Sequence, residues 1–276
     1  MRHNGAVFEN VIVPFDGSLP ARAALAPAAD LAWRCGGRVV IVNNTDASDK
    51  KSRDALKSRA ISMSGADVDF WVDTDHSIGR AVIEAARFRE DPIVCLPVRS
   101  KTGGLRRKAV LNAMAAEILL EAPAPVLVIG PETDVSRGLG LAEVVVALDG
   151  SAASEQVLPI AVALARALKL RLSLVGVVRE DSGGQGHHVA ETGYLREHLE
   201  KIEGELPEAS FDLLEAVDPA SGLLARLRQR DNAIVAMSTH GRSGVDRKPL
   251  GGVSQAVLLK SPRPMLFVRP RADEAA

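Results

Sequence analysis

The amino-acid sequence predicts an α/β fold built from two similar domains, each with a parallel β-sheet flanked by helices. The first observation is a repeat. VIVPFDGS at residues 11–18 returns as VVVALDGS at 144–151, and APAPVLV at 122–128 returns as SPRPMLF at 261–267. Matches that open and close each half in the same order indicate a duplicated domain, because the repeats of a solenoid are far shorter.

The second observation is the pattern of the apolar segments. Runs such as VVIV at 39–42 and IVCL at 93–96 are continuous rather than alternating, which is typical of strands buried on both faces. Helical patterns such as AVIEAA at 81–86 lie between these runs. Strands that alternate with helices favour right-handed crossovers and a parallel sheet.

These patterns assign the elements in chain order. The first half is predicted to hold strand 10–15, helix 19–34, strand 38–43, a polar helical stretch at 50–63, strand 67–73, helix 78–89, strand 92–97, helix 109–120 and strand 125–130. The second half is predicted to hold strand 143–148, helix 153–168, strand 171–178, helix 188–204, strand 210–217, helix 219–230, strand 233–238, a loop at 239–250, helix 252–260 and strand 264–269.

Two local signals support this division. Asp218 and Pro219 form a good helix start, with an N-cap carboxylate followed by proline at the first helical position. The segment from Glu132 to Gly140 is polar and contains glycine, so it is interpreted as a linker. The predicted domains are therefore residues 1–132 and 141–271.

The composition excludes several classes of function. The 276 residues are 46% apolar with a net charge of −1, so the chain can fill two cores but has no overall field that attracts nucleic acid or an anionic membrane. The 3% of aromatic residues argue against a base-stacking surface. No signal-peptide core and no apolar stretch of about 20 residues is present. Cys35 and Cys95 lack metal spacing and are expected to pack in the cores, which favours a reducing cytoplasm.

The candidate ligand site lies at the carboxyl ends of the strands, where open doubly wound sheets bind their ligands. After the first strand of each half come Asp16 and Asp149, each followed by Gly-Ser. A carboxylate there can accept a hydrogen bond from an exocyclic amine or a ribose hydroxyl. It can equally cap the helix that follows, and the residues alone leave both roles open.

The loop after the fourth strand of the second half is rich in glycine. Residues 238–244 read STHGRSG, and residues 251–254 read GGVS at the start of a helix. Glycines allow backbone N–H groups to converge on an anion, and the helix N-terminus adds partial positive charge. Arg242, Arg247 and Lys248 add local positive charge. This position, after a strand and before a helix, favours phosphate binding over a plain connection.

Together these features resemble a tandem universal stress protein. The resemblance rests on two Asp-Gly-Ser openings, a Thr-His-Gly loop, a Gly-Gly-Val-Ser helix start and a Pro-x-Pro before the last strand, and it covers nearly the whole chain. It implies two tandem Rossmann-like domains of the adenine nucleotide alpha-hydrolase-like type, each a five-stranded parallel sheet with the strand order 3-2-1-4-5. It also implies ATP, with or without Mg²⁺, as the ligand.

The family's nucleotide motif reads Gly-x-x-Gly, nine residues, then Gly-Ser or Gly-Thr. The second half keeps the spacing, but Ser238 replaces a glycine that would lie close to ribose, and Gly252 replaces the hydroxyl residue that would contact phosphate. Ser254 is a candidate substitute hydroxyl. By the same resemblance Asp149 would contact adenine and Val175 or Val177 would border it. The implied nucleotide-binding residues are Asp149, Gly150, Val175, Val177, Ser238, His240, Gly241, Arg242, Gly244, Gly251, Gly252, Val253 and Ser254, with Asp16 as a weaker candidate in the first domain.

The first half departs further from the motif. Ser100 stands for the second glycine, Asn112 and Ala113 stand for the Gly-Ser pair, and the spacing is longer by two residues. Pro97 has no backbone N–H to donate. The loop keeps its basic residues, but we expect its backbone cradle to be lost, so that one site is degenerate and the other partly preserved.

Other motifs favour simpler explanations. SGGQG at 182–186 lacks the Asp-Ser of adenylate-forming pyrophosphatases and is interpreted as a flexible loop. His187 and His188 are adjacent and have no partners with metal-ligand spacing, so no metal is expected. The sequence shows no Ser-His-acid order, nucleophile elbow or Walker loop. His240 is the only histidine in the candidate site, and no catalytic residue is assigned.

Three functions follow as hypotheses. The first is a non-catalytic stress-response protein that binds ATP mainly through the second domain. The second is a stress-response scaffold that has lost nucleotide binding and acts through protein contacts, which the residues at 238 and 252 favour. The third is an enzyme that uses bound ATP for group transfer. Each domain's last strand is an apolar edge, which an intramolecular pseudo-dimer or a homodimer would cover. Neither nucleic acid nor a membrane is an expected partner.

Overall fold

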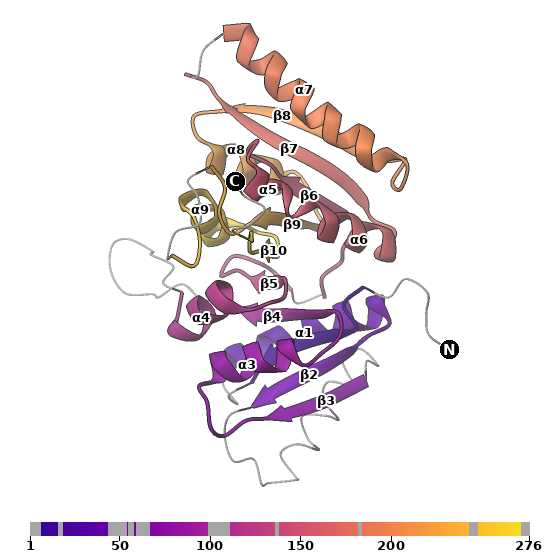
Figure 1. The fold of residues 1–276 in the computed structure, drawn as a ribbon, viewed down its shortest axis with the longest axis vertical. Helices are drawn as coiled ribbons and strands as arrows, with labels where there is room; N and C mark the ends of the chain where they lie inside the picture. Colours follow the sequence, from indigo (N-terminus) through magenta and orange to yellow (C-terminus); the bar gives the residue numbers. More distant parts are fainter. Residues whose placement is uncertain are drawn as a thin grey trace. The chain divides into compact units, whose positions relative to one another are not determined.

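The computed structural model describes residues 7–15, 19–43, 54, 58, 67–98, 111–135, 138–181, 184–242 and 248–271 (Figure 1). The chain divides into two compact units, Met1–Leu139 and Gly140–Ala276. The boundary between them falls inside the predicted linker. Both units are α/β, with parallel strands and flanking helices, as predicted.

The first unit follows the predicted element order. It contains β1 (Asn10–Pro14), α1 (Leu19–Cys35), β2 (Arg38–Asn43), β3 (Asp67–Val72), α3 (Ile78–Arg87), β4 (Pro92–Pro97), α4 (Ala113–Glu121) and β5 (Val126–Ile129). Its strands pair in parallel in the order β3-β2-β1-β4-β5, which is the order implied by the resemblance. The helical stretch predicted at 50–63 lies outside the described residues.

The second unit repeats this plan. It contains β6 (Glu143–Ala147), α5 (Ala152–Glu155), α6 (Leu158–Leu168), β7 (Arg171–Arg179), α7 (Gly184–Glu203), β8 (Ser210–Ala216), α8 (Pro219–Arg228), β9 (Ala233–Ser238), α9 (Gly252–Lys260) and β10 (Met265–Val268). Its strands pair in parallel in the order β8-β7-β6-β9-β10. The first strand, β6, therefore lies between β7 and β9. The strand order reverses at β6, because β7 and β8 lie on one side of it and β9 and β10 on the other.

The helix predicted at 153–168 is in fact two helices, and this prediction was wrong. α5 ends at Glu155, and α6 begins at Leu158 with Pro159 in its first turn. Proline has no N–H to bond the carbonyl four residues earlier, so a continuous helix through this point would lose a hydrogen bond and meet a steric clash. Within the first turn of a new helix the same residue is well tolerated.

The cores explain why the strand predictions succeed. Every residue of β1 and of β6 is buried, because helices cover both faces of the central strands. In the first unit α1 and α3 both pack on β1, β2 and β4, and in the second unit α7 and α8 both pack on β7 and β8. Cys35 and Cys95 are buried as predicted, and burial raises the pKa of each thiol to about 12, so neither forms a thiolate near neutral pH.

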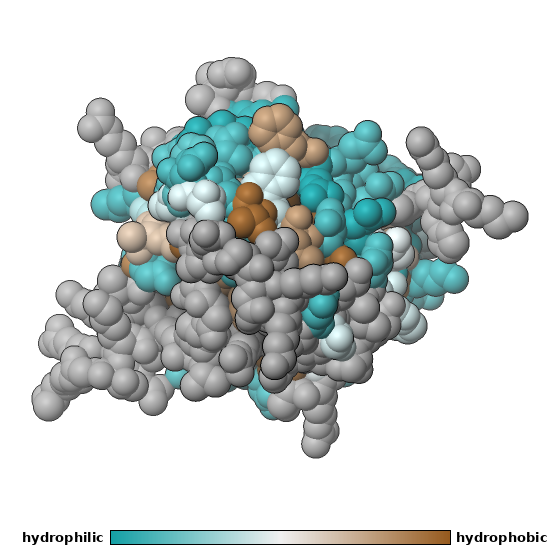
Figure 2. Space-filling model, turned by 90° about the horizontal axis from the view of Figure 1, so that it is seen from below, coloured by the Kyte–Doolittle hydropathy of each residue, from teal (hydrophilic) through white to brown (hydrophobic). Residues whose placement is uncertain are grey.

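The first unit also carries exposed aromatic surface. Trp71 of β3 and Phe88 at the end of α3 stack with ring centroids 5.9 Å apart, and the Arg89 guanidinium lies 6.0 Å from the Trp71 ring centroid. Phe88 is 72% exposed. Figure 2 shows apolar and aromatic side chains gathered among hydrophilic ones. Among the helices of the described residues, none has the length and apolar character that a membrane crossing requires.

Candidate functional site

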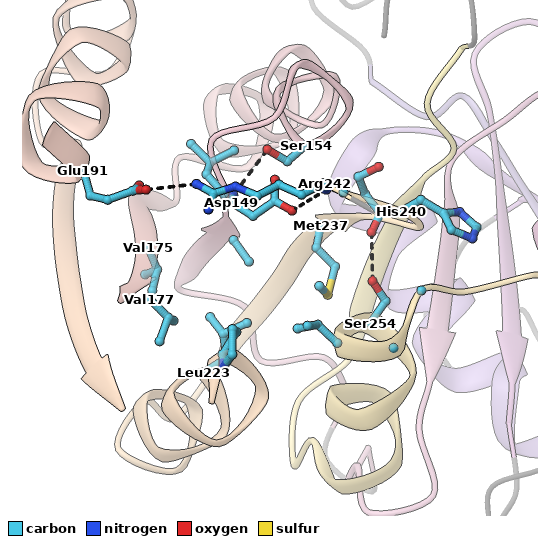
Figure 3. A pocket seen from close by; sticks show the side chains of 18 residues that line it. Asp149, Ser154, Val175, Val177, Glu191, Leu223, Met237, His240, Arg242 and Ser254 are labelled. Carbon is cyan, nitrogen blue, oxygen red and sulfur yellow. Dashed lines mark hydrogen bonds and ion pairs between the residues drawn. The ribbon is translucent and has the colours of Figure 1, made fainter. Parts of the chain in front are cut away.

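A cavity of about 440 Å³ opens at the carboxyl ends of β6, β7 and β9 in the second unit (Figure 3). This volume lies within the usual range for small-molecule sites. The position is the one expected for a doubly wound sheet, where the strand order reverses. The lining residues are Ala147, Leu148, Asp149, Ser154, Val175, Val177, Glu191, Pro219, Leu223, Met237, Ser238, His240, Gly241, Arg242, Gly251, Gly252, Val253 and Ser254.

The structure brings most of the predicted site residues together around this cavity. Those that line it are Asp149, Val175, Val177, Ser238, His240, Gly241, Arg242, Gly251, Gly252, Val253 and Ser254. Gly150 does not line it. Instead Gly150 has a φ of +78°, and a Cβ there would lie 2.7 Å from Nη2 of Arg242. The predicted residues Asp16 and Gly244 lie outside the described residues.

Sequence reasoning missed the residues contributed by elements that the motif does not mark. These are Ala147, Leu148, Ser154, Glu191, Pro219, Leu223 and Met237. Pro219 and Leu223 could have been found, because α8 starts at the carboxyl end of β8, at the same edge of the sheet as the predicted loops. Glu191 lies within the long helix α7, and no local pattern distinguishes it from the other acidic residues there.

One end of the cavity is apolar. Val175 and Val177 lie two residues apart on β7 and so project from the same face of the strand. Leu223 of α8 and Met237 of β9 complete this end. In Figure 3 the two valines and Leu223 lie on one side of the cavity, His240 and Ser254 lie on the other, and Met237 lies between them. A flat apolar ring can pack against these side chains.

Asp149 ties the loop after β6 to the loop after β9. Its Oδ1 accepts hydrogen bonds from the backbone N–H of Ser151 at 3.1 Å and from the Ser151 hydroxyl at 2.5 Å. Its Oδ2 accepts the backbone N–H of Arg242 at 2.8 Å. Burial acts to raise the pKa of Asp149, but these hydrogen bonds outweigh it and hold the pKa below its usual value.

The helix-capping role considered for Asp149 belongs to its neighbour. Ser151 is the N-cap of α5, and its hydroxyl oxygen accepts the backbone N–H of Ser154 at 3.2 Å. Asp149 accepts the hydrogen of that same hydroxyl, so it orients the cap rather than supplying it. The side of Oδ2 that does not face Arg242 keeps a lone pair for a ligand donor.

Gly241 allows this contact between the two loops. A Cβ at this position would lie 1.9 Å from Oδ2 of Asp149, closer than any two non-bonded heavy atoms can approach. The position therefore needs glycine because of the Asp149 carboxylate, whether or not a ligand is bound. The backbone N–H of the next residue, Arg242, is the one that reaches Oδ2.

An ion pair lies beside the Asp149 carboxylate. Nη2 of Arg242 donates to Oε1 of Glu191 on α7 at 2.9 Å, and the two side chains are 59% and 17% exposed. Figure 3 shows Arg242 reaching between Glu191 and Asp149. The charge that Arg242 was predicted to offer a phosphate is thus balanced by a carboxylate from another helix.

The N-terminus of α9 forms the polar end of the cavity. Its N-cap, Gly251, makes no side-chain capping bond, and its own N–H donates to the Thr239 carbonyl at 2.8 Å. The N–H groups of Gly252, Val253 and Ser254 belong to the first turn, where a helix offers no partner of its own. A Cβ at Gly252 would meet no atom within 4 Å, so space for a ligand group adjoins this turn.

Ser254 does not supply the hydroxyl donor that Gly252 lacks. Its Oγ donates to the backbone carbonyl of Ser238 at 3.1 Å, and the side chain is buried. This bond holds the first turn of α9 against the end of β9. The hydroxyl hydrogen is already used, so the expectation that it serves a phosphate is not supported by this arrangement.

His240 and Ser238 are buried polar residues of the lining. Nδ1 of His240 lies 3.1 Å from Oγ1 of Thr239, within its own loop. Ser238 is 5% exposed, and within the described residues its hydroxyl has no hydrogen-bond partner.

Also within the described residues, no three His, Cys, Asp or Glu side chains gather as they would around a metal ion.

The fold and this cavity define the second unit as a doubly wound α/β protein with a ligand pocket at its switch point. Residues 142–269 match the family model described as the Universal stress protein family. The second unit therefore belongs to the universal stress protein family. The tandem form fits the chain, because the first unit has the same order of parallel strands.

Solved structures agree on the fold. A universal stress protein from Archaeoglobus fulgidus DSM 4304 superposes with a TM-score of 0.71 at 19% identity, covering 95% of this chain and 98% of that chain. A functionally unknown protein from Pseudomonas aeruginosa PAO1 gives 0.61 at 17% identity, with coverages of 95% and 93%. The cytoplasmic domain of a prokaryotic cation chloride cotransporter gives 0.57 at 14% identity, with coverages of 94% and 95%. No curated protein sequence matches the chain.

Proposed function

We propose that the second unit binds an adenine nucleotide, such as ATP, and takes part in a stress response without catalysing a reaction. One observation carries this proposal. A single cavity joins an apolar compartment to the N-terminus of α9, which has no side-chain cap. A nucleotide has the matching polarity, with a planar base at one end and phosphate at the other.

At the apolar end the base would pack between Val175, Val177 and Leu223. Asp149 is placed beside this compartment, and its carboxylate stays ionised near neutral pH because its pKa is lowered. An ionised carboxylate is a hydrogen-bond acceptor only. It therefore favours a base that carries an amine donor, as adenine does.

At the polar end the phosphate would meet the N–H groups of Gly252, Val253 and Ser254. The helix dipole adds partial positive charge at the same point. Arg242 can join this subsite by exchanging its Glu191 partner for a phosphate oxygen. Mg²⁺, where present, would neutralise part of the charge on a triphosphate.

Binding without catalysis is supported by the state of the two residues that could act as a base. Asp149 has a lowered pKa and already accepts three hydrogen bonds, which makes it a weak base near neutral pH. His240 is 4% exposed, and one of its ring nitrogens contacts Thr239. We therefore infer a binding protein whose hydrolysis of ATP, if measured, is slow.

A second candidate is a scaffold that works through protein contacts. The exposed Phe88 ring, stacked on the half-buried Trp71 of the first unit, favours it, because large apolar side chains on a surface often mark interaction sites. The scaffold function does not need the cavity of the second unit. The two candidates therefore differ in a single measurable property, which is whether nucleotide stabilises the protein.

The test is thermal melting with and without MgATP, using variants at Gly252. A ligand present at 100 times its Kd stabilises by about 2.7 kcal/mol, so the melting temperature of the wild type should rise. Gly252→Asp places a negative charge in open space at the N-terminus of α9. There the charge interacts favourably with the helix dipole but repels phosphate. Gly252→Asn is the neutral control of the same shape.

We expect the rise in melting temperature to vanish in Gly252→Asp and to persist in Gly252→Asn, with both apo variants as stable as the wild type. A wild type that shows no rise at millimolar MgATP contradicts the proposal and favours the scaffold. An equal rise in both variants contradicts the placement of the phosphate at α9.

A further inference from the structure

The Arg242 side chain crosses the end of the cavity that we assign to the base. It lines the cavity and is nevertheless 59% exposed, so it lies at the mouth, where the cavity meets solvent. Figure 3 shows this side chain extending from the loop after β9 toward Glu191 of α7. The Glu191 side chain also lines the cavity and is only 17% exposed. The guanidinium is therefore held from a largely buried position on the far side of the mouth.

Three contacts hold this side chain in place. The backbone N–H of Arg242 donates to Oδ2 of Asp149 at 2.8 Å, which fixes the near end. The guanidinium lies against Gly150, where a Cβ would come within 2.7 Å of Nη2. Nη2 donates to Oε1 of Glu191 at 2.9 Å, which fixes the far end. Arg242 thus bridges the loop after β9 and α7, and it contacts the loop after β6 between them.

We infer that Arg242 and Glu191 form a strap that gates the base end of the cavity: their ion pair opens to admit a ligand and closes again when that ligand carries no phosphate. This inference rests on the proposed function and adds the control of ligand exchange to it. An ion pair that reaches solvent suits this use, because it favours its closed state by only a few-fold. Segments that close over a ligand commonly set the rate at which it enters and leaves.

The strap should act differently on a nucleoside and on a nucleotide. Adenosine has no phosphate to draw Arg242 away from Glu191, so the strap is closed both before and after adenosine binds. Loss of the ion pair then speeds entry and exit equally and leaves Kd unchanged. ATP offers Arg242 a phosphate oxygen in place of Glu191, so loss of the ion pair speeds its entry alone and lowers Kd.

A second ion pair on α7 provides the matched control. Nζ of Lys201 lies 2.7 Å from Oε1 of Glu197, but both residues belong to α7 and neither lines the cavity. Glu197→Gln therefore removes the same charge from the same helix without changing the strap. A difference between Glu191→Gln and Glu197→Gln separates the strap from a general change in charge.

The experiment measures the binding of adenosine to the full chain, because the charge of Glu191 neither attracts nor repels a neutral ligand. NMR relaxation dispersion of the adenine ring protons gives koff, and calorimetric titration gives Kd. In Glu191→Gln we expect kon and koff both to rise about threefold, with little change in Kd. Arg242→Gln keeps the backbone N–H that binds Asp149 and should give the same result. The double variant should exchange adenosine no faster than either single variant, because both substitutions break one ion pair.

Salt provides a second readout. Screening weakens the wild-type ion pair, so koff for adenosine should rise with salt in the wild type and stay constant in Glu191→Gln. Rates that do not change in Glu191→Gln, or that change equally in Glu197→Gln, would overturn the strap. A wild type that binds ATP but not adenosine would overturn it as well, because the closed strap has to cover an occupied base compartment. Failure of the wild type to bind either ligand would instead overturn the proposed function.

Discussion

The backbone of Gly241 packs directly against the carboxylate of Asp149, so closely that a Cβ on Gly241 would lie 1.9 Å from Oδ2. The contact joins the loop after β6 to the loop after β9 on adjacent strands. The next residue, Arg242, donates its backbone N–H to the same oxygen. The shape of the cavity therefore depends on a glycine that also belongs to the nucleotide motif.

Gly241→Ala should destabilise the second unit and impair nucleotide binding together. The added methyl group forces the two loops apart, which breaks the bond from the Arg242 N–H to Asp149. We expect a loss of about 2–3 kcal/mol in the free energy of unfolding, typical of overpacking combined with a lost charged hydrogen bond. Urea unfolding measures this loss.

Gly193→Ala is the matched control. Gly193 lies within α7, where a Cβ would meet no atom within 4 Å, so alanine should stabilise the helix by up to about 1 kcal/mol. If Gly241→Ala were as stable as the wild type, the close contact with Asp149 would not constrain the loops.

Gly252→Ser should strengthen nucleotide binding. Gly252 is the first residue of α9, and a side chain there enters open space at the end of the cavity that we assign to phosphate. A serine hydroxyl would supply the donor that Ser254 cannot give. A single hydrogen bond to a charged acceptor predicts a Kd lower by about tenfold. Calorimetric titration with ATP measures the change, Gly252→Ala serves as the control without a hydroxyl, and equal affinities for the two variants would argue against a phosphate at this position.

Glu191→Gln should also strengthen the binding of an anionic nucleotide. The substitution removes a negative charge beside the cavity. It also replaces the ion pair between residue 191 and the Arg242 guanidinium with a weaker, neutral hydrogen bond. We expect a few-fold lower Kd for ATP, with a smaller effect in high salt because the groups are partly exposed. Glu197→Gln is the control on the same helix, since Glu197 pairs with Lys201 and does not line the cavity. An unchanged Kd in Glu191→Gln would show that Arg242 does not contact the ligand.

The sequence predicted the parts of this protein that depend on local pattern. Continuous apolar runs located the central strands, because strands covered on both faces are apolar throughout. The polar, glycine-containing segment at 132–140 contains the boundary between the two units, and the glycine loop together with the residues that follow the first strand located most of the cavity. All of these signals are contained within a few consecutive residues.

The parts that sequence reasoning missed depend on contacts between distant elements. Glu191 lines the site only because α7 packs over β7 and β8, and nothing in the helix itself marks that residue. The Ser254 hydroxyl donates to the carbonyl of Ser238, and this hydrogen bond depends on how α9 packs against the end of β9. The break between α5 and α6 was visible in advance as Pro159, but the strong apolar pattern of the segment hid it.

The Asp149 carboxylate should make the stability of the second unit depend on pH in the acid range. Burial works to raise the pKa of Asp149, yet the hydrogen bonds from Ser151 and Arg242 leave it below the value of an unfolded aspartate, which is about 3.9. A group with a lowered folded pKa stabilises the protein above its unfolded pKa, and that stabilisation is lost as the pH falls through the folded value. Asp149→Asn should therefore melt well below the wild type at pH 7. The difference should begin to shrink below about pH 4, where the unfolded carboxyl takes up its proton, and should be lost as the pH falls through the lower pKa of the folded carboxyl. Melting temperatures at pH 7, 5, 4 and 3 measure this, with Glu200→Gln on the exposed face of α7 as the charge-matched control. A difference between wild type and Asp149→Asn that stays the same at pH 3 would mean that the shape of the side chain, and not its charge, holds the two loops together.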